Sequence, residues 1–373
     1  MLATAQGAQG EYIFLPQEKV IYGAGSLARL AAETNRLACR RALVVTGRTL
    51  ATQTPLIGTV ESLLGARHAG TYADIRQHVP ESGIVEATRL AREVQADLLV
   101  SVGGGSPIDA AKAIARALAG PDGAFVRHIA VPTTLSAAEF SHVAGFTDEA
   151  TKSKTGFADV RATPRVVILD PEMTLATPMW LWLASGIRAL DHAVETLYSP
   201  GYHPVNDVLA LQAIRGLFEF LPRCRAAPGS LDARQQCQIA AWMSYFGPAS
   251  VSAHSGLSHT LGKRIGATYD VPHGVTSCII LAHVMRYKAA NEADAARLAP
   301  MARALNLVAA EASDQEAALA AADAVAGLVL QLELPSRLRD VDVPKDALES
   351  VARSPIGDSP HMAEVVDILR RAW

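Results

Sequence analysis

The sequence predicts a two-domain protein in which an α/β domain with a parallel sheet is followed by an all-α C-terminal domain. Short apolar, strand-like runs alternate with helix-like segments as far as Asp170-Pro171. Such alternation is typical of a parallel, doubly wound sheet covered by helices. Beyond that point strand signals nearly vanish. The length of 373 residues favours two domains at roughly 150 residues each. We place them at residues 1–172 and 173–373.

Five segments of the first domain have the pattern of strands. The run at 97–102 is almost continuously apolar, as expected for a strand with both faces covered. Helices are expected near 55–64, 82–94 and 107–118, the last with proline in its first turn. The expected strands are residues 42–46, 68–72, 97–102, 128–131 and 165–169.

The second domain is rich in alanine, the strongest helix former, and reads as a series of helices. The expected helices are residues 183–197, 207–221, 231–245, 255–265, 276–286, 292–305, 315–332 and 362–371.

Composition excludes several classes of protein. Half of the residues are hydrophobic and 19% are charged, so the chain can bury a large core. A net charge of -3 and 5% aromatic residues are unlike a nucleic-acid-binding protein. There is no apolar run of membrane-spanning length and no secretory pattern at the N-terminus, so we expect a cytoplasmic protein. The four cysteines lie far apart, which predicts free thiols in a reducing compartment.

Three consecutive glycines follow an expected strand and open an expected helix. They are Gly103, Gly104 and Gly105, followed by Ser106 and, in the same helix, by Asp109. Glycines let the backbone approach a phosphate, and a helix N-terminus offers free N–H groups and partial positive charge. This loop therefore favours the pyrophosphate of a dinucleotide, although a tight strand-to-helix turn would also use glycine.

A second polar loop follows the next expected strand. It contains Thr133, Thr134 and Leu135, whose position at a strand's carboxyl end suits contact with a nucleotide. A simple turn would explain these residues equally well. The two loops together favour nucleotide binding more strongly than either loop does alone.

Histidines gather in the helical half of the chain. His192 lies four residues after Arg188, and His259 lies four residues before Lys263, so each pair shares a helix face. His273 follows a Val-Pro pair. This grouping favours His192, His259 and His273 as a metal-binding or catalytic set. We expect structural roles for His254 and His283.

These motifs resemble those of the iron-containing (group III) alcohol dehydrogenase and dehydroquinate-synthase-like superfamily. The segments that carry the resemblance are GGGSPIDAAKAIA, VPTT, VVILDPEMT, SGIRALDHAVETLYS, GLSHTLGKRIGATYDVPHG and LAHVMRY. Within the superfamily, YADIRQHVPE, PTTLSAAEF, GFTDEATKSKTG and ILRRAW are most similar to maleylacetate reductases. The resemblance implies a Rossmann-like first domain, an all-helical second domain of the dehydroquinate-synthase type, and a homodimer.

The resemblance also implies a metal site that this sequence matches only in part. The family uses an aspartate and a histidine four residues apart, then two further histidines. The three histidine positions match His192, His259 and His273, whereas the aspartate position is Arg188. A further catalytic histidine of the family corresponds to Lys263. The adjacent Asp191 cannot simply replace the aspartate, because it points in another direction from the helix.

Arg188 would repel a divalent cation, so we expect no catalytic metal. Its guanidinium could instead bind a substrate carboxylate or stabilise a developing alkoxide, or it could merely pair with Asp191 or Glu195. Proton donation would then fall to His259 or His273, with Lys263 and Tyr269 as further candidates.

The expected cofactor is NAD(H) or NADP(H). Thr46 begins the loop at the adenosine end, and Arg48 beside it would permit the 2′-phosphate of NADP. The resemblance implies that Lys154 lies near the nicotinamide ribose.

The resulting expectation is an NAD(P)H-dependent reductase of the maleylacetate-reductase type, which would act in aromatic-ring degradation. Alternatives are a metal-dependent alcohol dehydrogenase acting on small alcohols or aldehydes, a non-redox lyase of the same superfamily, and a binding module without catalysis. We expect neither a nucleic-acid nor a membrane partner.

Overall fold

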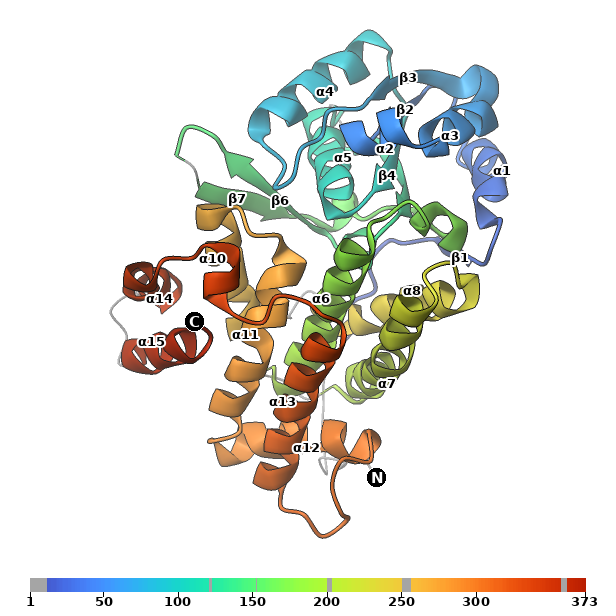
Figure 1. Ribbon diagram of the computed structural model, residues 1–373. Coiled ribbons are helices and arrows are strands. Elements are labelled where there is room, and N and C mark those ends of the chain that lie inside the picture. The colour runs from blue at the N-terminus through green and yellow to red at the C-terminus, as the bar shows by residue number, and fades with distance from the viewer. Residues whose placement is uncertain (1–11, 121–122, 152, 200–202, 250–255, 357–360) are drawn as a thin grey trace. The chain divides into compact units, whose positions relative to one another are not determined.

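Figure 1 shows the computed structural model of the chain, which describes residues 12–120, 123–151, 153–199, 203–249, 256–356 and 361–373. The chain forms two compact units, which we describe separately. The first contains residues 14–178 and 228–238, and the second contains the other described residues. The division into two domains near residue 172 stays a prediction. The two compact units are defined by which parts of the chain lie close together, and this does not show which segments fold independently.

The first unit is built on a six-stranded sheet in which every neighbouring pair of strands is parallel. This confirms the predicted parallel α/β architecture. All five expected strands are present, and β1 is an additional short edge strand that pairs with β8. The strand order is β1 (Lys19–Tyr22), β8 (Val166–Leu169), β5 (Arg127–Pro132), β4 (Leu98–Gly103), β2 (Ala42–Val45) and β3 (His68–Tyr72).

Helices cover both faces of this sheet. The face formed by alternate residues such as Val44 and Val100 packs against α1 (Leu30–Arg36) and α3 (Leu56–Leu64). The opposite face, which includes Leu43 and Leu99, packs against α4 (Glu81–Glu93) and α5 (Gly105–Ala117). Because side chains alternate along a strand, one strand supplies both cores. The short α2 (Arg48–Gln53) follows β2.

An antiparallel hairpin, which the sequence did not predict, follows the sheet's fifth strand. Its strands are β6 (Val143–Asp148) and β7 (Ser153–Ala158), and its aromatic residues pack against the core cluster that contains α4 and α5.

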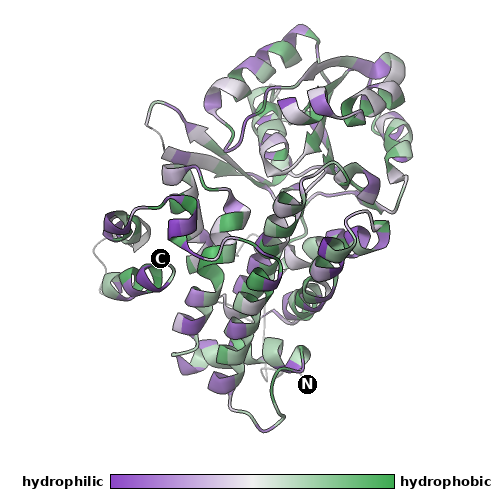
Figure 2. Ribbon diagram, in the orientation of Figure 1, coloured by the Kyte–Doolittle hydropathy of each residue, from purple (hydrophilic) through white to green (hydrophobic). Residues whose placement is uncertain are grey.

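The remaining segments are helical, as expected. Helix α6 is buried along most of its length, so each polar side chain that it carries needs a partner. Figure 2 shows that a surface helix such as α15 is instead two-sided, with Val365 and Leu369 buried. The eight expected helices are present, and α9 and α14 are additional. The bounds are α6 (Met179–Tyr198), α7 (Pro204–Ala226), α8 (Leu231–Ser244), α9 (Phe246–Ala249), α10 (Leu257–Tyr269), α11 (His273–Lys288), α12 (Glu292–Ala304), α13 (Asp314–Gln331), α14 (Leu348–Ile356) and α15 (Met362–Arg371).

All four cysteines are free and buried, which confirms the prediction of unpaired thiols. In the part of the chain that is described, no helix has both the length and the apolar character needed to cross a membrane.

Candidate functional site

The glycine-rich loop lies where β4 ends and α5 begins. Gly103 has φ +142°, a backbone conformation that side chains rarely allow, and a Cβ atom there would lie 2.8 Å from Pro107. Gly104 precedes the first turn of α5 without a side-chain cap. A Cβ on Gly104 would lie 3.1 Å from Cγ2 of Thr134. The loop therefore requires glycine for its conformation and for its close approach to the threonine loop.

The sheet brings the two predicted cofactor loops together. Gly103 pairs with Pro132 in the β4–β5 ladder, and the backbone N–H of Thr133 donates to the Gly103 carbonyl at 2.9 Å. A Cβ on Gly105 would lie 3.4 Å from Oγ of Ser136. The loops are thus neighbours at the carboxyl edge of the sheet, where nucleotides bind in proteins of this architecture.

This arrangement suits an anion. The first N–H groups of a helix have no partner within the helix, and the helix dipole adds partial positive charge at the same end. Glycines and the small Ser106 leave room for a phosphate to reach those groups. The residues present therefore fit the pyrophosphate of a dinucleotide.

Several other predicted cofactor residues have internal partners. The Thr46 hydroxyl donates to the Val102 carbonyl at 2.8 Å and joins neighbouring strand ends. The Leu135 side chain is fully buried. These contacts indicate that Thr46 and Leu135 support the two loops from beneath.

Asp109 and Lys154 connect α5 and the hairpin to their surroundings. Asp109 accepts hydrogen bonds from the Gly145 N–H at 3.2 Å and from Nζ of the buried Lys112 at 3.2 Å. Nζ of Lys154 donates to the His78 carbonyl at 2.8 Å. These bonds place both side chains beside the first strand of the hairpin.

In the helical unit, α6 carries a buried charged cluster. Arg188 Nη1 lies 3.6 Å from Oδ2 of Asp191 and donates to the Ser277 hydroxyl at 3.2 Å. Oδ2 of Asp191 also accepts from the hydroxyls of Ser258 at 2.9 Å and Ser277 at 2.6 Å. Arg188 therefore does pair with Asp191, one of the two carboxylates considered as its partner.

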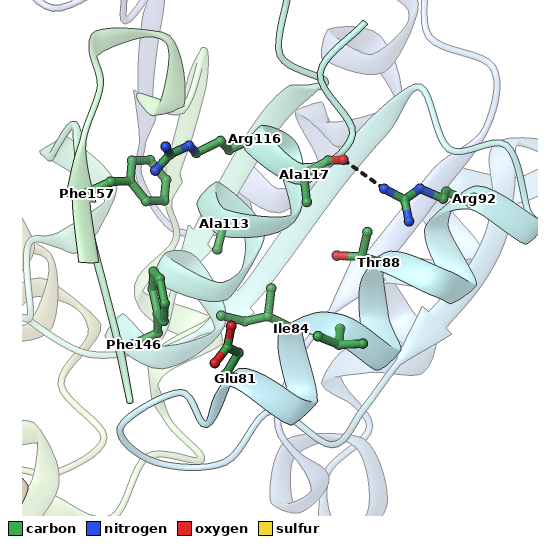
Figure 3. Close-up of a pocket in the computed structure, with 10 residues that line it drawn as sticks. Glu81, Ile84, Thr88, Arg92, Ala113, Arg116, Ala117, Phe146 and Phe157 are labelled. Carbon is green, nitrogen blue, oxygen red and sulfur yellow. Dashed lines mark hydrogen bonds between the residues drawn. The ribbon is translucent and has the colours of Figure 1, made fainter. Parts of the chain in front are cut away.

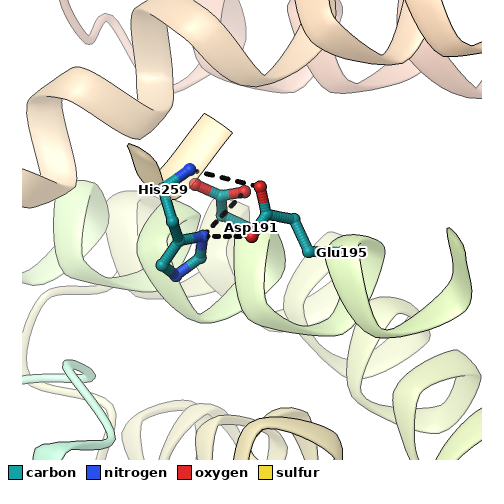
Figure 4. Close-up of side chains that lie close together, drawn as sticks. All are labelled: Asp191, Glu195 and His259. Atoms are coloured by element: carbon teal, nitrogen blue, oxygen red, sulfur yellow. Dashed lines mark hydrogen bonds and ion pairs between the residues drawn. The ribbon is translucent and has the colours of Figure 1, made fainter. Parts of the chain in front are cut away.

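The same carboxylates face His259 on α10 (Figure 4). Nδ1 of His259 lies 2.6 Å from Oε2 of Glu195 and 3.6 Å from Oδ1 of Asp191. Glu195 also accepts from the backbone N–H groups of Gly256 at 2.9 Å and His259 at 3.2 Å, and from the Tyr198 hydroxyl at 3.1 Å. Glu195 thus fixes the start of α10 and lies in ionic contact with the His259 ring.

A glycine is required at the start of α10. A Cβ atom on Gly256 would lie 2.4 Å from the carboxyl carbon of Glu195. Only the absence of a side chain lets the two helices bring the carboxylate this close to His259.

His192 lies beside this cluster and contacts it through its ring. The ring centroids of His192 and His259 are 4.8 Å apart, and the Tyr245 ring meets His192 edge-on at 4.8 Å. Burial, and then the charges of His259, Arg188 and Lys263, hold the pKa of His192 well below its usual value. His192 is therefore a neutral side chain near neutral pH.

The two predicted residues farther along the chain occupy different environments. Lys263 is exposed on α10. His273 is half-buried at the start of α11, and its Nδ1 would lie 3.1 Å from a Cβ placed on Gly266. Neither belongs to the group formed by Asp191, Glu195 and His259, which we call the carboxylate–histidine trio. His254 lies outside the described residues.

Charge balance sets the pKa values in the cluster. Burial opposes charge on each group, but the carboxylates of Glu195 and Asp191 outweigh burial and Arg188, and they raise the pKa of His259. The Asp191 pKa is lowered because His259, Arg188 and Ser277 outweigh its burial. Burial lowers the pKa of Arg188, while Asp191 and Glu195 oppose that effect. These shifts favour an ionic network.

The trio also has the spacing of a possible metal site. Ligand atoms of Asp191, Glu195 and His259 all lie within 4.8 Å of one another, and the donor types suit a divalent ion. Among the described residues, Oδ1 of Asp191 has no hydrogen-bond partner. Arg188 already places one positive charge beside these carboxylates. The expected absence of a metal is therefore not confirmed.

The sequence argument missed the carboxylate partners. It placed His192, His259 and His273 together; the rings of His192 and His259 do lie 4.8 Å apart, but the carboxylates that face His259 are those of Asp191 and Glu195. The available signal was the spacing of two acidic residues four apart within an apolar, buried helix, since such residues share one face and require partners.

Comparison with known proteins shows to which protein family the chain belongs. The iron-containing alcohol dehydrogenase family model matches residues 16–171, and the model of that family's C-terminal domain matches residues 182–371. The chain therefore belongs to the iron-containing alcohol dehydrogenase family and is an oxidoreductase.

Individual members of the family show which enzymes this chain resembles. A maleylacetate reductase from Pseudomonas sp. strain P51 is 36% identical over 271 residues, which cover 72% of this chain and 73% of the relative. A crystal structure of maleylacetate reductase from Agrobacterium tumefaciens superimposes with a TM-score of 0.82 at 27% identity, over 98% of this chain and 99% of that one. A structure of 1,3-propanediol oxidoreductase gives a TM-score of 0.90 at 26% identity, over 98% and 100% of the two chains. The predicted superfamily and fold are thus confirmed.

Proposed function

We propose that this protein is an NAD(P)H-dependent reductase of the maleylacetate-reductase type, which transfers hydride to a ketone that carries carboxylates. The observation that carries the proposal is Arg188, a nearly buried cation in a cluster with His259 in the helical unit. A guanidinium binds a carboxylate through two parallel hydrogen bonds, which suits a keto-acid better than a simple aldehyde. The relatives named maleylacetate reductase support the same substrate class.

The glycine-rich loop and the threonine loop would hold the cofactor. The pyrophosphate would bind the N–H groups of Gly104, Gly105 and Ser106, with Thr133 and Thr134 beside them. When bound, the reduced nicotinamide supplies the hydride. Arg48 is exposed and pairs with Asp74 at 3.0 Å, and both NAD and NADP stay candidates.

In the helical unit, Arg188 would orient the substrate and stabilise negative charge that develops on the ketone oxygen. His259 would donate the proton, because Glu195 and Asp191 favour its protonated form. His273 and Lys263 are further candidates for this proton, and His192 would line the site.

We also infer that the reaction does not depend on a divalent metal. Arg188 and protonated His259 offset both carboxylate charges, so no net negative charge is left to attract a divalent ion. The guanidinium would also repel such an ion by several kcal/mol at short range.

The test is an assay of NADH and NADPH oxidation with maleylacetate and with simple aldehydes, each with and without EDTA. We expect turnover of maleylacetate that EDTA leaves unchanged. Stoichiometric metal that EDTA removes together with activity would overturn the metal-independent reaction. Turnover of aldehydes alone would overturn the substrate class.

A metal-dependent alcohol dehydrogenase is the second candidate, and the spacing of Asp191, Glu195 and His259 favours it. Metal analysis of the purified protein separates the two. Tight cofactor binding with no net oxidation of any substrate would instead favour the non-redox lyase alternative. We further propose a cytoplasmic homodimer, to be tested by light scattering on the purified protein.

A further inference from the structure

A pocket lies between α4, α5 and the β6–β7 hairpin (Figure 3). Its volume is about 430 Å³, which falls within the range of small-molecule sites. All of its lining residues belong to the first compact unit. The proposed reaction uses none of them.

The pocket is separate from the glycine-rich loop. On α5 it is lined by Ala113 and Arg116, which come eight and eleven residues after Gly105. At about 1.5 Å per residue, these positions lie roughly 12 Å or more along the helix from the glycine-rich loop that would bind the pyrophosphate. A ligand here would not occupy the pyrophosphate position.

The walls of the pocket are apolar and aromatic. Ile84 and Ala113 form part of the buried core beneath it, and Phe146 and Phe157 of the hairpin face it from the other side. Val85 at its rim is 62% exposed. A flat apolar ligand would cover surface that water now reaches.

One buried polar group in the pocket lacks a protein partner. Thr88 is 5% exposed, and among the described residues its hydroxyl has no hydrogen-bond partner. In Figure 3 the hydroxyl points into the space that the labelled side chains enclose. A buried hydroxyl without a partner is unfavourable, so a ligand that hydrogen-bonds it gains that interaction.

The two ends of the pocket differ in charge. Nη2 of Arg92 donates to the Ala117 carbonyl at 3.0 Å, which holds its guanidinium at the end of α5 (Figure 3). The Arg116 guanidinium lies 4.4 Å from the Phe157 ring centroid. Glu81 lies eleven residues before Arg92 on α4, roughly 16 Å away along the helix. The pocket therefore has a cationic end and an acidic end.

We propose that this pocket binds a small aromatic carboxylate. The ring would lie against Phe146 and Phe157, and the carboxylate would pair with Arg92. The Thr88 hydroxyl, one helical turn before Arg92, would donate a hydrogen bond to the same carboxylate.

The test is calorimetric titration of the full chain with para-hydroxybenzoate and with its neutral counterpart, para-hydroxybenzamide. The variants are Arg92→Ala and Thr88→Val, with Arg89→Ala as the matched control. Arg89 is an arginine of the same helix that pairs with Glu93 and does not line the pocket. Circular dichroism confirms that each variant is folded.

We expect para-hydroxybenzoate to bind wild type and Arg89→Ala alike. Arg92→Ala should weaken binding by about tenfold or more, the loss of one charge-assisted hydrogen bond, and Thr88→Val by several-fold. The amide should bind more weakly than the acid. Equal binding of acid and amide, equal binding by wild type and Arg92→Ala, displacement of the probe by NADH, or no binding at millimolar concentration would each overturn the proposal.

Discussion

Nδ1 of His259 lies 2.6 Å from Oε2 of Glu195, and both side chains are less than one-tenth exposed. With Nδ1 directed at a carboxylate, Nε2 lies on the side of the ring away from Glu195 and Asp191 (Figure 4). A carboxylate beside a ring nitrogen favours the protonated imidazole. In the proposed reaction, this contact would favour His259 in its protonated form, ready to donate a proton.

Replacing the Glu195 carboxylate with an amide should impair catalysis. Glu195→Gln keeps the shape but removes the negative charge that favours the protonated ring. We expect kcat to fall by about 10- to 100-fold, while the Kd for NADH is unchanged. Steady-state kinetics and a cofactor titration test this. Glu219→Gln, on an exposed ion pair of α7, is the control and should behave as wild type. An unaltered kcat in Glu195→Gln would show that the contact serves only the fold.

Arg188 should discriminate between substrates. If its guanidinium binds a substrate carboxylate, Arg188→Ala should lower kcat/KM for maleylacetate by about 100- to 1000-fold, and Arg188→Lys should recover part of this loss. The kcat/KM for an aldehyde without a carboxylate should fall much less. An equal fall for both substrates would mean that Arg188 acts only as the partner of Asp191. Arg264→Ala, an exposed position on α10, controls for loss of charge.

Gly104 should be essential for cofactor binding. A Cβ there would lie 3.1 Å from Cγ2 of Thr134, so the glycine-rich loop or the threonine loop would have to shift. We expect Gly104→Ala to raise the Kd for NADH by about tenfold or more, since it would displace helix N–H groups from the anion. The matched control is Gly58→Ala in α3, where a Cβ would meet nothing within 4 Å. Fluorescence titration and thermal melting measure both variants, and an unchanged Kd in Gly104→Ala would contradict the assignment.

Glu139 should make the protein less stable as pH rises. Its side chain is 2% exposed, and burial raises the pKa of Glu139 to about 7, against 4.5 in an unfolded chain. Between these values the folded state holds a proton that the unfolded state has released. The stabilisation is therefore complete below about pH 4.5 and is lost as pH rises toward 7.

Glu139→Gln removes this titration. We expect the free energy of unfolding to fall between pH 5 and pH 8 by up to about 3 kcal/mol more in wild type than in the variant. Urea unfolding at the two pH values measures the difference. Parallel pH dependence in the two proteins would show that Glu139 is ionised in the folded state.

The strand and helix pattern could be derived from local sequence because it rests on local physics. Continuous apolar runs such as 97–102 become buried strands, and alanine-rich periodic segments become helices. The edge strand β1 and the β6–β7 hairpin were missed. Their residues are only partly buried and lack a clear alternating pattern, so pairing partners decide their conformation.

The sequence by itself determined the family, the parallel sheet and the glycine-rich loop, since each depends on short segments with a fixed order. It also showed that an arginine stands at position 188. Only the tertiary structure decided which side chains meet across helices that are distant in the chain: it paired Glu195 of α6 with His259 of α10, and it brought Ser277 of α11 to Arg188 and Asp191. The physical reason is burial, because charged groups removed from water must find opposite charge nearby, and only packing of the helices decides which groups are within reach.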